Sequence, residues 1–97
     1  MPDLDLDRGL DLDRGWDLHP QVSLRPEPFG ALLYHFGTRK LSFLKDTTLL
    51  AVVRSLADSP TARDACIAAG VEDAQLPRYR RALATLAESS MVVERAS

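Results

Sequence analysis

Residues 31–44 read ALLYHFGTRKLSFL, two alternating apolar runs that meet across Gly37 and Thr38. A Gly-X pair in this position is typical of a two-residue type II′ hairpin turn, in which glycine supplies the positive φ. The register that this turn implies pairs Phe36 with Arg39, Tyr34 with Leu41 and Leu32 with Phe43 on one face, and His35 with Lys40 and Leu33 with Ser42 on the other. Because the first face is larger and more apolar, we expect it to be the core side and the second face to be wetter.

A further strand precedes this hairpin. Residues 21–25, QVSLR, alternate between polar and apolar, and Pro26 and Pro28 end the run because proline cannot donate to a strand ladder. We therefore expect a three-stranded antiparallel sheet built from residues 21–25, 31–36 and 39–44. The last of these strands is predicted to be an open edge.

The rest of the chain has helical periodicity. Asp46 or Thr47 can cap a first helix, Thr61 a second that Gly70 closes, and Pro77 suits the first turn of a third. Apolar residues recur at i, i+3, i+4, i+7 and i+8 in the first and third helices: Leu49, Val52, Val53, Leu56 and Ala57, and then Tyr79, Ala82, Leu83, Leu86 and Ala87. The predicted fold is α+β, a three-stranded antiparallel sheet followed by three helices in a winged helix-turn-helix-like arrangement. Residues 91–93 are expected to pack back as a short apolar tail.

Charge divides the chain of 97 residues unevenly. Its formal net charge is −2, but residues 1–19 hold six Asp and two Arg, so the remainder carries +2. This acidic stretch repeats LDLDRG at residues 4–9 and 10–15, too few copies for a stacked solenoid and too rich in Asp for a strand. We predict a disordered acidic tail over residues 1–15, a folded domain over 16–93 and a C-terminal tail over 94–97. Deleting residues 1–15 is then expected to leave the melting temperature nearly unchanged.

Catalytic and metal-binding patterns are scarce. The single cysteine, Cys66, lies on a small-residue helical stripe and is predicted to be a buried structural thiol, which suits a reducing compartment. His19 and His35 lack the companion ligands of a zinc site, and no phosphate-binding or nucleophile motif occurs. We predict a protein that is not an enzyme and has no cofactor and no metal. Without a signal peptide or about 20 consecutive apolar residues, it is expected to be cytoplasmic with no membrane partner.

Two functions remain open at this point. Arg78, Arg80 and Arg81 near the start of the third helix would suit a winged-helix DNA-binding protein, although Glu72 and Asp73 precede them. Alternatively, the open edge at residues 40–44 beside that helix would accept an extended peptide as an added strand. The basic residues near that edge, Lys40, Lys45, Arg78 and Arg80, would favour an acidic peptide.

Two stretches carry a resemblance to a known family. Residues 24–44, LRPEPFGALLYHFGTRKLSFL, resemble the signature of the mycofactocin biosynthesis peptide chaperones, and residues 83–89, LATLAES, resemble their C-terminal helix. This family resembles the peptide chaperones of pyrroloquinoline-quinone biosynthesis, which are RiPP recognition elements. The resemblance implies a non-catalytic protein that binds the leader of a ribosomal precursor peptide and delivers it to a radical S-adenosylmethionine maturase. Nucleic acid would not be a partner.

The resemblance also implies which residues bind the leader, because in these proteins it adds to the third strand and lies beside the third helix. Carried over to this sequence, the peptide-binding residues are Lys40, Leu41, Ser42, Phe43 and Leu44 on the strand, and Tyr79, Arg80, Leu83 and Leu86 on the helix. Of the helical residues, Tyr79, Leu83 and Leu86 also belong to the core stripe of that helix. A Ser42→Pro change is the expected test of strand addition. An exposed edge of this kind also leaves a homodimer open.

Overall fold

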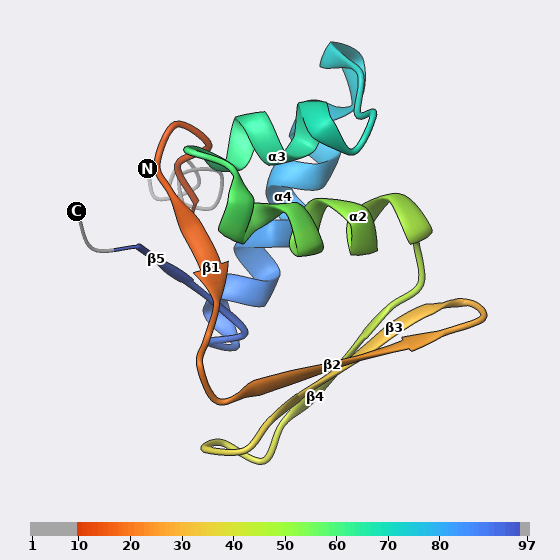
Figure 1. Cartoon of the computed structure of the whole chain (residues 1–97), viewed down its shortest axis with the longest axis vertical. Helices are drawn as coiled ribbons and strands as arrows, with labels where there is room; N and C mark the ends of the chain where they lie inside the picture. The colour runs from red at the N-terminus through yellow and green to blue at the C-terminus, as the bar shows by residue number, and fades with distance from the viewer. Residues whose placement is uncertain (1–9, 96–97) are drawn as a thin grey trace, which may run out of the picture.

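A three-stranded antiparallel sheet runs along one side of the molecule in the computed structural model, which describes residues 10–95 (Figure 1). Its strands are β2 (Val22–Glu27), β3 (Gly30–His35) and β4 (Leu41–Leu44), in that order. In β3 and β4, Tyr34 pairs with Leu41 and Leu32 with Phe43, so the predicted register is confirmed. β4 lies at the edge of the sheet, as predicted.

The turn between β3 and β4 differs from the predicted two-residue type. His35 and Lys40 close a loop of four residues, in which Arg39 rather than Gly37 takes the positive φ, at 65°. The imidazole Nδ1 of His35 accepts the backbone N–H groups of Gly37 and Thr38 at 3.0 and 3.1 Å. These two bonds hold the loop amides against the imidazole ring. His35 itself, which was expected on a wetter face, is only 3% exposed.

The helices cover the sheet face opposite to the one predicted. Ala31, Leu33 and Leu44 face inward and are at most 1% exposed, whereas Phe36 and Phe43 on the other face are 58% and 57% exposed. The expectation that the larger apolar face is the core is therefore wrong. Small inner side chains such as Ala31 let the helices approach the strands closely, and the bulky rings are left outside.

β2 runs through Pro26 instead of ending before it. The N–H of Phe36 donates to Gln21 at 2.8 Å, and hydrogen-bonded positions alternate along an antiparallel ladder. Pro26, which is opposite Ala31 in the register, falls on a position whose nitrogen faces away from β3. Its missing donor therefore costs the sheet nothing.

Three helices follow the sheet, in agreement with the predicted α+β fold: α2 (Thr47–Ser55), α3 (Ala62–Ala68) and α4 (Leu76–Glu88). Short 3-10 turns at Leu56–Asp58 and Asp73–Gln75 follow α2 and precede α4. Asp46 accepts the N–H of Thr48 and Thr61 that of Asp64, so both predicted N-caps are confirmed. Gly70 ends the α3 turn with a φ of 89°.

A second, two-stranded sheet that was not predicted joins the ends of the described chain. β1 (Trp16–Leu18) pairs antiparallel with β5 (Val92–Glu94). Arg95 then donates from its guanidinium to the carbonyl oxygens of Trp16, Leu56 and Ser59 at 3.0–3.1 Å. The predicted C-terminal tail is therefore wrong for residues 94 and 95, and residues 96–97 lie outside the described part of the chain.

Residues 10–15, the second copy of the LDLDRG repeat, are packed against the helices. Leu10 and Leu12 are 1% and 7% exposed and belong to the core. The carbonyl oxygens of Leu12 and Arg14 accept the N–H groups of Arg63 and Ala62 at 2.8 and 2.9 Å. These are the first amides of α3, which lack partners within the helix. The predicted disordered tail is thus wrong for residues 10–15, and the first copy at residues 4–9 lies outside the described residues.

Candidate functional site

The outer edge of β4 is unpaired, because among residues 10–95 no strand lies beside it. The N–H of His35 donates to the carbonyl of Lys40 at 2.9 Å, and antiparallel ladders alternate residue by residue. The peptide group of Ser42 therefore faces β3, while those of Leu41 and Phe43 face the open edge. It follows that Ser42→Pro would break the sheet's own ladder, so the residues that test strand addition are Leu41 and Phe43.

A hydrogen-bonded cluster ties the first turns of α4 to the chain that leaves β4. The hydroxyl of Tyr79 donates to Oδ2 of Asp46 at 2.6 Å, and Oδ1 of Asp46 accepts the N–H of Thr48 at 2.8 Å. The guanidinium of Arg78 lies 3.6 Å from Oδ2 of Asp46 and stacks over the Tyr79 ring at 5.4 Å. Asp46 therefore caps α2 and anchors α4 at once, which sets the position of α4 relative to the end of β4.

The same contacts perturb the titration of both partners. The Tyr79 hydroxyl, with the amides of Thr48 and Leu49 and the charge of Arg78, holds the pKa of Asp46 below its usual value, although burial opposes this. The bond to Asp46, aided by burial, raises the pKa of Tyr79. Both shifts favour the ionised Asp46 and the neutral Tyr79 in the folded protein.

We predict that Asp46→Ala lowers the free energy of unfolding by about 1–2 kcal/mol at pH 7. The folded pKa of Asp46 is depressed, so its stabilisation is present above the unfolded pKa and is lost as the pH falls through the folded pKa. The difference in the free energy of unfolding between the variant and the wild-type protein should therefore become smaller towards pH 3. Urea unfolding at both pH values measures it, with Asp58→Ala as the control. An equal difference in unfolding free energy at the two pH values would contradict the stabilising role of the ionised Asp46 carboxylate.

The structure separates the predicted site residues into two groups. Lys40, Leu41 and Phe43 are exposed along β4, and Ser42 is half-buried between them. Four others are buried in the core, with exposures of 5% or less: Leu44, Tyr79, Leu83 and Leu86. The buried group belongs to the core and presents almost no surface to a peptide in this structure.

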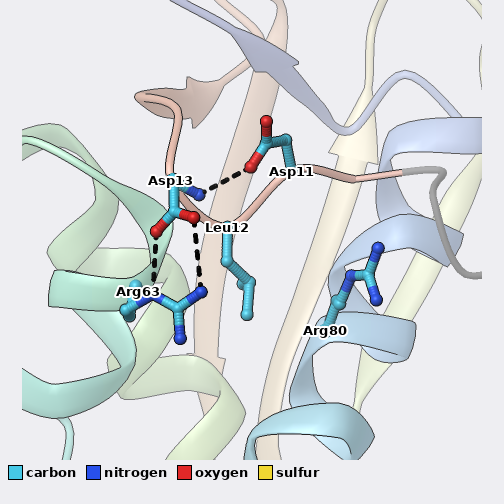
Figure 2. A pocket seen from close by; sticks show the side chains of 5 residues that line it. All are labelled: Asp11, Leu12, Asp13, Arg63 and Arg80. Atoms are coloured by element: carbon cyan, nitrogen blue, oxygen red, sulfur yellow. Dashed lines mark hydrogen bonds and ion pairs between the residues drawn. The ribbon is translucent and has the colours of Figure 1, made fainter.

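Arg80 contacts the second hexapeptide copy. Its Nε donates to the carbonyl oxygen of Leu10 at 3.1 Å. Figure 2 shows it on α4, across a pocket of about 570 Å³ from the ion pair of Arg63 and Asp13, which are 2.8 Å apart; Asp11 and Leu12 complete the lining. Sequence reasoning missed this pocket, because it treated residues 10–15 as a tail. The sequence did contain a signal for their burial, because leucine recurs at every second position, at Leu10 and Leu12.

A second pocket, of about 440 Å³, lies beside the end of β4. It is lined by Phe29, Phe43 and Lys45. The rings of Phe29 and Phe43 are 6.2 Å apart and tilted by 48°. Phe29 was absent from the predicted site, although an aromatic residue in a Pro-Phe-Gly turn is a signal of an exposed apolar contact.

No cluster of three or more His, Cys, Asp or Glu side chains that could hold a metal ion occurs in residues 10–95. Cys66 is fully buried, and this burial raises the pKa of its thiol, partly offset by the charge of Arg63. No helix in the same range is long and apolar enough to cross a membrane.

An unpaired strand edge next to an apolar pocket is typical of a domain that binds an extended peptide. The comparisons with known proteins point the same way. A family model described as the peptide chaperone MftB family matches residues 15–93, and the chain belongs to this family. The resemblance to mycofactocin peptide chaperones in residues 24–44 is thereby confirmed.

Three curated relatives, each named peptide chaperone MftB, support the assignment. The protein of Mycobacterium tuberculosis is 66% identical over 93 residues, which cover 96% of this chain and 80% of the relative. That of Mycobacterium ulcerans is 69% identical over 75 residues, 77% of this chain and 69% of the relative. The Mycolicibacterium smegmatis protein is 64% identical over 75 residues, 77% and 74% of the two chains. No solved structure matches this chain.

Proposed function

We propose that this peptide chaperone binds the leader of a ribosomal precursor peptide by adding it as a strand to β4, and delivers it to a radical S-adenosylmethionine maturase in mycofactocin biosynthesis. The observation that supports this most directly is the unpaired edge of β4. The N–H and C=O groups of Leu41 and Phe43 point away from the sheet there, and an extended peptide is the simplest partner that satisfies them.

An added strand would place its side chains alternately on the two faces of the sheet. Those on the outer face would lie beside Leu41 and Phe43, which are 56% and 57% exposed, and could reach the pocket at Phe29. Those on the inner face would lie beside Ser42. Backbone bonds would provide affinity, and the aromatic pocket would select an apolar leader residue.

Charge favours an acidic leader. Lys40 and Lys45 stand at the two ends of β4, and neither forms an ion pair with a carboxylate of residues 10–95. Exposed lysines of this kind affect the association rate and orientation more than the affinity. We expect leader binding to accelerate at low ionic strength.

The chaperone would act by position and carry out no chemistry itself. By holding the leader, it converts the encounter of the precursor's reactive end with the maturase into a linked-site event at a raised effective concentration.

The arginines of α4 favour this function over DNA binding. Arg78 lies against Asp46 and Arg80 donates to the Leu10 carbonyl, so two of the three cations proposed for a recognition helix are engaged within the chain. The third, Arg81, is exposed, and its side chain makes no ion pair or hydrogen bond with residues 10–95.

Titration of a labelled synthetic peptide that spans the leader of the proposed precursor tests the proposal. We expect a Kd well below 1 mM, together with slowed hydrogen exchange at the amides of Leu41 and Phe43. The amide of Ser42, which already faces β3, provides the internal control and should change little. An affinity weaker than about 1 mM, or protection elsewhere than at β4, would contradict strand addition.

A further inference from the structure

Most of the exposed large apolar side chains in residues 10–95 gather on one surface. Four of the five, Phe29, Phe36, Leu41 and Phe43, are 48–58% exposed and lie on the outer side of the sheet; the fifth, Ile67, lies on α3. With the half-buried Leu32 and Tyr34 they form what we call the outer aromatic face. Contiguous apolar surface of this kind marks an interaction site in a monomeric protein.

The rings of this face are already held in fixed positions. Tyr34 and Phe36 pack edge-to-face with their centroids 5.1 Å apart, and Phe29 and Phe43 lie 6.2 Å apart. Leu41 pairs with Tyr34 in the register and Leu32 with Phe43, so the two aromatic pairs are joined by leucine. A partner would therefore meet a rigid surface and would spend little conformational entropy on ordering it.

Strand addition leaves most of this face uncovered, because the peptide's outward side chains reach only Leu41 and the pocket at Phe29 and Phe43. A peptide that pairs with Leu41 and Phe43 lies in the plane of the sheet, whereas the side chains of the outer aromatic face project out of that plane. The peptide's own outward side chains would widen the same surface. The face thus needs a different occupant, one that meets a broad sheet surface, as a folded protein does.

Charge indicates the chemistry of that protein. Lys45 lines the pocket with Phe29 and Phe43, and Arg25 pairs with Leu32 across β2 and β3. Glu27, whose carboxylate is 3.8 Å from Arg25, offsets one of these two positive charges, so the three side chains together leave a net positive charge. Two copies of this chain would place like charges together, whereas a surface with carboxylates around an apolar centre would be complementary.

We propose that the outer aromatic face is a docking surface for a folded protein partner whose own surface has an apolar centre surrounded by carboxylates. Resting on the proposed function, we take that partner to be the maturase that receives the leader. The chaperone then binds peptide and enzyme through adjoining but separate surfaces, the edge of β4 and the face of the sheet. A bound leader enlarges the docking face, so leader and maturase should strengthen each other's binding.

The test measures the affinity of each variant for two probes, the labelled leader and the purified radical S-adenosylmethionine maturase of the proposed function. Phe36→Ser, at a residue outside the pocket proposed for the leader, should weaken maturase binding about tenfold and leave leader binding within about twofold. Ile67→Ser is the matched control, because Ile67 is 59% exposed, close to the 58% of Phe36, but lies on α3. It should change neither affinity, and both variants should keep the wild-type melting temperature.

Other results would overturn the docking surface. Full maturase affinity in Phe36→Ser, or no maturase binding by wild-type protein that binds the leader, would contradict it. Leader binding that weakens in parallel would show that the peptide itself covers the face. A wild-type dimer that Phe36→Ser converts to monomer in analytical ultracentrifugation would assign the face to a second copy. Failure of the proposed function is separate, since wild-type protein would then not bind the leader.

Discussion

The Phe43→Pro variant is expected to bind the precursor leader about 100-fold more weakly than wild-type protein and to keep its fold. Proline removes the N–H that Phe43 presents to the open edge, and its ring occupies the space where the added strand would lie. Loss of one backbone bond together with this clash accounts for roughly 2–3 kcal/mol. Fluorescence anisotropy with the labelled leader measures the affinity, and circular dichroism measures the fold.

Two further variants test which group of the protein binds the leader. One separates the backbone N–H of Phe43 from its side chain, and the other separates the open edge of β4 from the ladder between β3 and β4. Phe43→Ala keeps the N–H and should weaken binding far less than Phe43→Pro. Ser42→Pro removes a donor that faces β3, so it should lower the melting temperature as well as the affinity. If Phe43→Pro binds the leader as tightly as wild-type protein, the peptide does not add to β4.

Deletion of residues 1–15 is expected to lower the free energy of unfolding by about 4 kcal/mol or more. The truncation removes Leu10 and Leu12, two buried leucines, each comparable to a core Leu→Ala change of about 2–5 kcal/mol. It also strips the carbonyl partners from the first amides of α3, Ala62 and Arg63. For a domain of this size the melting temperature should fall by about 15–30 °C.

Deletion of residues 1–9 is the matched control, because it retains both leucines and the bonds to α3. The difference between the two truncations isolates the contribution of residues 10–15. In the full chain, Leu10→Ala should lower the free energy of unfolding by about 2–4 kcal/mol in urea unfolding. Equal melting temperatures for the two truncations would mean that residues 10–15 do not contribute to the core.

The stability provided by residues 10–15 is linked to the candidate peptide-binding site through α4. Arg80, which the family resemblance assigns to leader binding, donates to the carbonyl of Leu10, so residues 10–15 contact α4 directly. Asp46 and Tyr79 fix the other contact of α4, at the end of β4. The position of α4 relative to the peptide edge thus depends on two polar contacts at neighbouring residues of one helix.

Local patterns predicted much of the fold and the strand part of the site. Residues 31–44 define the hairpin register, because alternation and turn length act between near neighbours. The caps at Asp46 and Thr61 and the periodicity of the third helix are equally local. The open edge at residues 40–44 was predicted because this strand is the last of the three in the predicted sheet. The open edge suggested a peptide as partner, and the family resemblance favoured the peptide over DNA.

Patterns that depend on distant partners led to wrong expectations. The turn at Gly37 was predicted from composition, but the buried His35 ring controls its amides. Pro26 was predicted to end β2, but its nitrogen falls on the side that faces away from β3. The disorder predicted for residues 10–15 followed from charge, whereas α3 supplies amides and core space that the segment itself does not reveal.

The amino-acid sequence alone determined the order and type of the main elements, the register of β3 and β4, and the family, because these depend on residues close together in the chain. Only the tertiary structure decided which of two apolar sheet faces the helices cover. Both faces have strand periodicity, and the choice depends on how closely α2 can approach Ala31 and Leu33. That choice buried His35 and left Phe36, Leu41 and Phe43 on the surface, where a partner can reach them.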